Sequence, residues 1–129
     1  MEKIIKKWIE RAEYDLGTAK AMLNSHRYLY VTFMCQQAIE KLLKAIIIQY
    51  GGEVLRTHNL VRLAQLAAVY DAMSEGEQNF LADLTPFAIE ARYGDYRNKL
   101  SEITDKKMAT DYLAKTQRLF KWLQRKMGK

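Results

Sequence analysis

Apolar residues recur every three or four positions through the first fifty residues, which is the spacing of one face of an α-helix. The pattern predicts an amphipathic helix over residues 3–24, a short turn after Asn24 and a second helix over residues 28–50. The glycine pair at 51–52 ends the second helix, because glycine adopts the left-handed conformation of a helix end without steric cost. Two helices joined by so short a turn pack as an antiparallel hairpin.

Three further segments carry helical signals. A third helix is predicted over residues 60–72, with Thr57 or Asn59 as its N-cap. A fourth begins near Ser74, where Ser-Glu-Gly-Glu has the form of a capping sequence. The last helix is predicted over about residues 105–126.

Two segments between these helices break the pattern. Thr85-Pro86 interrupts the fourth helix, either by starting a short new helix with proline at its first position or by kinking the old one. From Arg92 to Thr104 the polar sequence is interpreted as a loop. The pattern therefore predicts one all-α domain over residues 1–129, an up-and-down antiparallel bundle of four main helices plus a short extra helix.

Composition excludes several classes of protein. The single cysteine, Cys35, rules out an internal disulfide, and its place on the apolar face of the second helix predicts an inert buried thiol. The chain lacks both a signal-peptide pattern and the roughly 20 apolar residues that span a bilayer. It also lacks the His and Cys spacings of metal sites and a phosphate-binding glycine loop. We expect a cytoplasmic protein with no membrane contact, no metal and no cofactor.

The net charge of +6 lies at the C-terminal end of the sequence. Residues 105–129 hold eight Lys and Arg against two Asp, whereas residues 1–104 hold thirteen of each sign. A stripe of this kind suits a nucleic-acid backbone or an acidic partner, or else is the solvated face of an amphipathic helix. At 100° per residue, five of these cations fall on one side of the last helix: Lys107, Arg118, Lys121, Arg125 and Lys129.

The second helix carries apolar residues on both of its sides. Such a helix has a second surface to bury, against another helix or another subunit. The alternative for its charges is a solvated face on which Glu40 and Lys44 form an ordinary supporting pair. The candidate residues for a partner or dimer interface are Phe33, Gln37, Glu40, Ile47 and Ile48.

Asp15 and His58 are the titratable residues whose positions suggest a role. Asp15 lies at the edge of the apolar stripe of the first helix, where a carboxylate needs a cation. Lys41 or Lys44 of the antiparallel helix can supply it, so Asp15 is either a structural ion-pair partner or a catalytic acid. His58 either binds phosphate or shuttles a proton near neutral pH, or it caps or packs locally. The other histidine, His26, is expected to be exposed.

The segment that follows residue 91 has the composition of an anion site. Arg92 and Arg97 flank a glycine and two tyrosines, which suits a phosphate or a stacked base. The alternative is that Arg92 pairs with Glu90 or Asp95 and Tyr93 packs. The candidate nucleotide- or RNA-binding residues are Arg92, Tyr93, Arg97, Lys44, Lys41 and His58, and the candidate catalytic residues among them are Arg92, Arg97 and His58.

Four segments, taken in order and spacing, resemble the HEPN domain family, named for nucleotide binding in higher eukaryotes and prokaryotes. They are AEYDL with Ala19, FMCQQAIEKLLKAIII, THNLVRLAQLA and ARYGDY, and the resemblance runs from about residue 8 to 125. It implies an up-and-down bundle, a homodimer, and a minimal nucleotidyltransferase as partner in a toxin–antitoxin arrangement.

Many members of that family are metal-independent ribonucleases whose motif is Arg, four to six residues, then His. Here Arg92 matches the arginine, but Arg97, Asn98 and Lys99 occupy the histidine positions and no histidine follows. An arginine stays protonated and rarely acts as a base. The resemblance therefore implies a dimeric module that acts with a minimal nucleotidyltransferase. The alternative is a nucleotide- or RNA-binding protein or weak metal-independent ribonuclease, so the sequence leaves enzymatic activity open.

Overall fold

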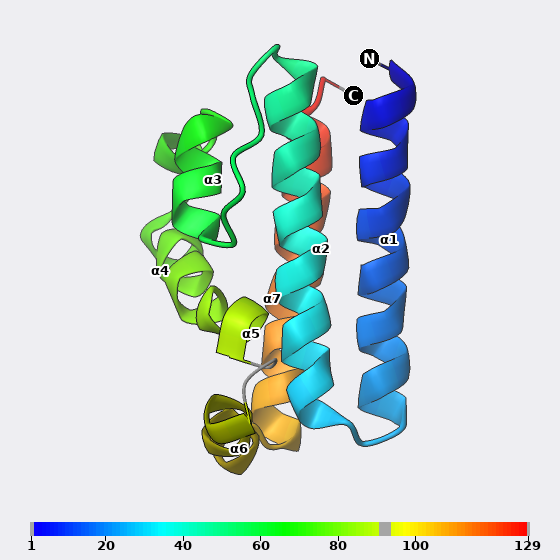
Figure 1. Cartoon of the computed structure of the whole chain (residues 1–129), viewed down its shortest axis with the longest axis vertical. Coiled ribbons are helices and arrows are strands. Elements are labelled where there is room, and N and C mark those ends of the chain that lie inside the picture. Colours follow the sequence, from blue (N-terminus) through cyan, green and yellow to red (C-terminus); the bar gives the residue numbers. More distant parts are fainter. Residues whose placement is uncertain (1, 91–93, 129) are drawn as a thin grey trace.

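Two long helices form a hairpin along one side of the molecule, and a third long helix packs against it. The computed structural model describes residues 2–90 and 94–128. Helix α1 spans Glu2–Asn24, α2 spans Tyr28–Gln49 and α7 spans Lys106–Lys126. Figure 1 shows α2 between α1 and the short helices, with α7 behind it. The predicted hairpin of antiparallel helices is confirmed, with helix bounds that differ from the predicted ones by one residue.

The long helices end in the left-handed conformation that closes a helix. Gly51 ends α2 with a φ of 83°, and the amide of Gly52 donates to the carbonyl of Ile47. His26 closes α1 with a φ of 64°, although it is not a glycine. His26 is exposed, as predicted, and its ring lies 3.2 Å from the Tyr28 hydroxyl. The turn between α1 and α2 is therefore as short as the sequence predicted.

Four short helices pack along the other side of α2: α3 (Leu60–Leu66), α4 (Glu75–Leu84), α5 (Pro86–Glu90) and α6 (Gly94–Ile103). A 3₁₀ turn, η1, spans Tyr70–Ala72. Ser74 starts α4 with the predicted capping box to Glu77. Pro86 begins a new helix, which confirms the first of the two predicted alternatives, and does not kink the old one.

Two boundaries differ from the predictions. The third helix ends at Leu66 instead of residue 72, because Ala68 adopts a φ of 60° and the next amide, of Val69, bonds back to the carbonyl of Ala64. Asn59, not Thr57, is its N-cap. The predicted loop over 92–104 is wrong for residues 94–103, which form α6. Leu100 anchors this polar helix, which has too few apolar residues to show the helical period.

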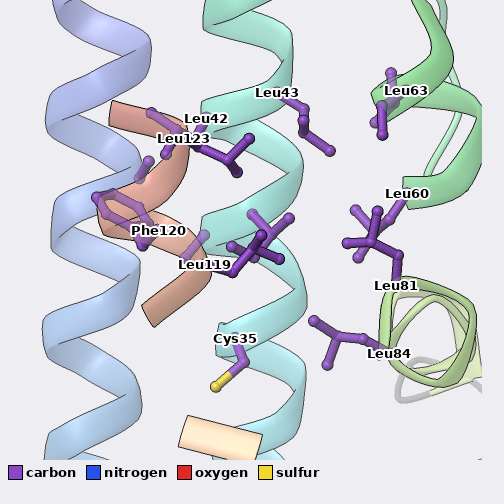
Figure 2. Close-up of a cluster of buried hydrophobic side chains, with 14 of the residues drawn as sticks. Cys35, Leu42, Leu43, Leu60, Leu63, Leu81, Leu84, Leu119, Phe120 and Leu123 are labelled. Atoms are coloured by element: carbon purple, nitrogen blue, oxygen red, sulfur yellow. The ribbon is translucent and has the colours of Figure 1, made fainter. Parts of the chain in front are cut away.

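The core surrounds α2 on two sides. Figure 2 shows Leu42 of α2 beside Leu119, Phe120 and Leu123 of α7, whereas Leu43 points toward the short helices. All of these residues are less than 4% exposed. The second apolar surface predicted for α2 is therefore covered by further helices of the same chain, and the all-α bundle architecture is confirmed. Among the described residues no helix is long and apolar enough to cross a membrane.

Candidate functional site

A diagonal of polar side chains runs along α2 within an otherwise apolar helix. Gln36, Glu40 and Lys44 follow one another at intervals of four residues, so they lie one above the next on one side of the helix. All three are buried. Burying an unpaired charge or amide is costly, so each of these groups needs a partner.

Glu40 is the centre of this cluster. Its Oε2 accepts a hydrogen bond of 2.8 Å from Lys44 Nζ, and its Oε1 accepts bonds from Gln36 Nε2 at 3.0 Å and from His58 Nδ1 at 2.9 Å. Burial alone would raise the pKa of the Glu40 carboxyl. The donors on Lys44, Gln36 and His58, with the charge of Lys44, outweigh burial and hold the pKa below its ordinary value of 4.5. Glu40 is therefore an ionised, fully bonded carboxylate inside the protein.

His58 reaches this carboxylate from the segment that connects α2 to α3. Gln36 Nε2 also donates to the backbone carbonyl of His58 at 3.1 Å, so both the ring and the backbone of His58 are held against α2. Because a carboxylate only accepts hydrogen bonds, Nδ1 of His58 carries the proton in this contact. In the neutral ring Nε2 is then the proton acceptor, and 34% of the side chain is exposed. The geometry is that of a histidine oriented by a carboxylate.

Asp15 and Lys41 form the ion pair that the sequence suggested. Asp15 is 7% exposed on α1 and accepts a hydrogen bond from Lys41 Nζ of α2. Lys41 Nζ also lies 3.5 Å from the Gln37 side-chain oxygen, and Gln37 Nε2 donates to Gln36 at 2.7 Å. The ion pair is thus linked to the Glu40 cluster through two glutamines. Lys41 and Lys44, both candidates for binding nucleotide or RNA, are engaged with carboxylates of this chain.

The predicted interface residues of α2 divide into two groups. Glu40 and Ile47 are 5% and 3% exposed and are buried within one chain. Phe33, Gln37 and Ile48 are half-buried. A partner that covers this side of α2 would therefore contact these three residues. It would not bind Glu40, whose carboxylate is already hydrogen-bonded within the chain.

The Arg92 segment lies partly outside the described residues. Arg92 and Tyr93 fall there, whereas Arg97 lies within α6. The structure therefore does not test whether these residues form an anion site. Of the candidates, it brings together His58 and Lys44, which both bond to Glu40.

The basic stripe of α7 lies on the outside of the bundle. Its members Lys107, Arg118, Lys121 and Arg125 are all exposed, and Lys129 lies outside the described residues. The nearby Lys115 forms an exposed ion pair of 3.1 Å with Asp111. Exposed pairs are screened by water and stabilise a fold little. This surface therefore differs in kind from the buried charges of α2.

Cys35 is fully buried on α2, and burial raises the pKa of its thiol to about 12. A thiol in this environment is protonated and unreactive, as the sequence predicted. Among the described residues no group of three His, Cys, Asp or Glu side chains gathers in the manner of a metal site.

A family model described as the HEPN domain matches residues 5–126, which is nearly the whole chain. The chain belongs to the HEPN domain family. This finding confirms the resemblance drawn from the four sequence segments.

The chain is also similar to one curated protein and to two solved structures. The chain is 39% identical over 56 residues to the protein named "Putative toxin MJ1304" of Methanocaldococcus jannaschii, a match that covers 43% of this chain and 36% of that protein. The HEPN fold is also similar to TT1696 of Thermus thermophilus, with a TM-score of 0.77 and 24% identity, and to ST0689, described as an archaeal HEPN homologue, with a TM-score of 0.73 and 22% identity. Each of the two structural comparisons covers 95% of this chain and 97% of the other chain, and each shows similarity of fold alone.

Sequence reasoning missed Gln36 in this HEPN domain. The side chain is fully buried, and it bonds to Glu40 and to the His58 backbone. The signal was present as the polar diagonal Gln36-Glu40-Lys44 among apolar neighbours. Its meaning depends on the segment after Gly52 folding back onto α2, which a helical period does not encode.

Proposed function

We propose that this HEPN protein is the helical component of a two-component, toxin–antitoxin-like system, and that it acts as a homodimer with a minimal nucleotidyltransferase. The observation that carries the proposal is the match of the HEPN domain to nearly the whole chain. The similarity to a protein named as a toxin supports it. The arginine at the histidine position of the usual ribonuclease motif favours a role through a partner over independent cleavage of RNA.

The side of α2 that carries Phe33, Gln37 and Ile48 is the surface that we assign to the nucleotidyltransferase. These side chains are half-buried and lie along the helix at intervals of four and eleven residues, which is one face. The charges beside them are neutralised by Asp15 and Glu40 within the chain. A partner therefore meets a mixed apolar and amide surface without having to desolvate an unpaired charge.

Binding of a minimal nucleotidyltransferase from the same genome tests this proposal. We expect the two purified proteins to form a complex in isothermal titration calorimetry, and Ile48→Lys to weaken it, because the lysine places an unpaired charge in the interface. Near the C-terminus of α2 a lysine complements the helix dipole, so the chain remains folded. Leu66→Lys is the matched control, since Leu66 is an exposed leucine at the end of α3. Equal binding by both variants would contradict the assigned surface, and no binding by the unmodified chain would contradict the partnership.

The second candidate function is nucleotide or RNA binding with weak, metal-independent ribonuclease activity. The hydrogen bond between His58 and Glu40 favours it, because a carboxylate that orients a histidine leaves Nε2 as a proton acceptor. Arg92, Tyr93 and Arg97 would then supply the phosphate and base contacts, as the sequence predicted.

RNA cleavage in EDTA distinguishes this alternative. His58→Asn keeps a donor close to the position of Nδ1 and removes Nε2, so a loss of cleavage assigns the base to His58 without breaking the Glu40 cluster. Arg92→Ala is expected to lose cleavage too if Arg92 holds the phosphate. Absence of cleavage by the unmodified protein would exclude the ribonuclease, and unchanged cleavage in both variants would exclude these residues.

A further inference from the structure

Helices α1 and α7 both pack on α2 but contact each other far less, and they leave a groove between them. One part of the groove, of about 850 Å³, lies between the first half of α1 and the last turns of α7. A second part, of about 410 Å³, lies between the second half of α1 and the middle of α7. Both parts are lined by Glu13 and Gln124, so they form one continuous groove along the two helices.

The walls of this groove carry apolar side chains that the chain leaves partly uncovered. Ile5, Ile9 and Leu16 of α1 line it and are half-buried, whereas Phe120 of α7, which lines it from the other side, is buried within the chain. Their spacing continues the apolar face of α1 beyond the part that α2 covers. A helical surface of this kind fits the ridges of another helix.

Gly17 lies near the middle of α1 and lines the groove. Glycine in a helix interior is less favourable than alanine, and a Cβ built at Gly17 would meet nothing within 4 Å. The packing of a single chain therefore gives no reason for a glycine at this position. A missing side chain there allows the backbone of a second molecule to approach closely.

The charges along the groove change sign from one end to the other. The end near the start of α1 holds Glu2, Glu10 and Glu13 against Lys6, whereas the other end holds Lys20 and Lys121. In an isologous pair the same surface faces itself with its direction reversed, so the acidic end of one copy meets the basic end of the other. This charge pattern complements its own copy, and a partner with a uniformly charged surface would not match it.

We propose that the α1–α7 groove is the surface on which a second copy of this chain docks, with α1 crossing its own copy at Gly17. The proposal rests on the homodimer in the proposed function, and it does not depend on the nucleotidyltransferase. The two α1 and two α7 helices form a four-helix arrangement around the dimer axis. In this arrangement Glu13 and Lys20, which lie four and three residues on either side of Gly17, come close together between opposite copies on both sides of the crossing.

Sedimentation equilibrium of the full chain and of Gly17→Leu tests the contact. We expect the unmodified chain to be a dimer and Gly17→Leu to be a monomer with unchanged helical circular dichroism, because leucine fills the space needed for the second backbone while suiting an isolated helix. Gly76→Leu is the matched control, since Gly76 is an exposed helical glycine of α4 with room for a side chain. This control is expected to remain a dimer.

Charge reversal tests the orientation of the two copies. Glu13→Lys and Lys20→Glu, each alone, are expected to weaken self-association by about tenfold or more. The two-fold axis repeats the Glu13–Lys20 contact, so each variant creates two pairs of like charges. Mixing the two variants is expected to restore a dimer with one copy of each, since both contacts are then between opposite charges. Failure of the mixture to associate would overturn the proposed orientation.

The outcomes separate the two proposals. A monomeric unmodified chain would overturn both the groove and the homodimer of the proposed function. A dimer that persists in Gly17→Leu would overturn the groove alone and leave the homodimer in place.

Discussion

Helices α2 and α7 both carry lysines, but they place them in opposite environments. On α2, Lys41 and Lys44 are largely buried and bonded to Asp15 and Glu40. On α7, the basic residues are exposed, and the ion pair Lys115–Asp111 lies in solvent. The difference shows that the basic residues of α2 contribute mainly to the internal structure, whereas those of α7 give the surface its charge.

The largest effect that separates the two helices is expected for Glu40→Gln. The substitution leaves Lys44 buried without a counter-charge and weakens the acceptor that faces three donors. Breaking a buried, hydrogen-bonded pair costs about 3–5 kcal/mol, so we expect a loss of that order in the free energy of unfolding. Urea unfolding followed by circular dichroism measures it. A loss as small as that of a surface substitution would show that Glu40 is not the structural centre of α2.

The pH dependence of the unfolding free energy tests whether the buried Glu40 of α2 is ionised. The pKa of Glu40 is lowered in the folded protein from its ordinary value of 4.5. Its stabilising contribution is therefore complete above that value and is lost as the pH falls through the lower, folded pKa. We expect the difference in unfolding free energy between the unmodified chain and Glu40→Gln to shrink from about pH 6 to about pH 3. A difference that stays constant over this range would contradict the ionised carboxylate.

The smallest effect is expected for Asp111→Asn on α7. The carboxylate is 54% exposed and its pair with Lys115 is screened by water, so we expect a change of less than about 0.5 kcal/mol. The same urea experiment serves as the counterpart of Glu40→Gln. A loss comparable to that of Glu40→Gln would remove the distinction between the two helices.

The sequence predicted the parts of the fold that depend on local pattern. The bounds of α1 and α2 and the capping box at Ser74 follow from helical spacing and cap chemistry. Helical spacing also indicated that Asp15 pairs with Lys41 or Lys44, and the structure shows Lys41. The two predictions that were wrong, the end of α3 and the loop in place of α6, concern features that depend on tertiary contacts. Ala68 adopts a conformation more typical of glycine, and α6 depends on Leu100 packing against Leu29 and Phe87.

Apart from Gln36, the members of the Glu40 cluster were predicted from the sequence, but their arrangement was not. Glu40, Lys44 and His58 were each named from the sequence, but the bond between His58 and Glu40 joins residues 18 positions apart through a connecting segment. Gly17, a glycine inside a helix, was not singled out by the sequence pattern. Its significance depends on the groove between α1 and α7, which no helical period reveals.

Helix α2 is proposed to bind the nucleotidyltransferase, and the α1–α7 groove to bind a second copy of the chain. Light-scattering mass of the complex between this chain and a minimal nucleotidyltransferase from the same genome tests that division most directly. With the unmodified chain we predict a complex that contains two copies of the 15.1 kDa chain, and with Gly17→Leu a complex that contains one. Loss of partner binding in Gly17→Leu, or no complex with the unmodified chain, would contradict this division between the two surfaces.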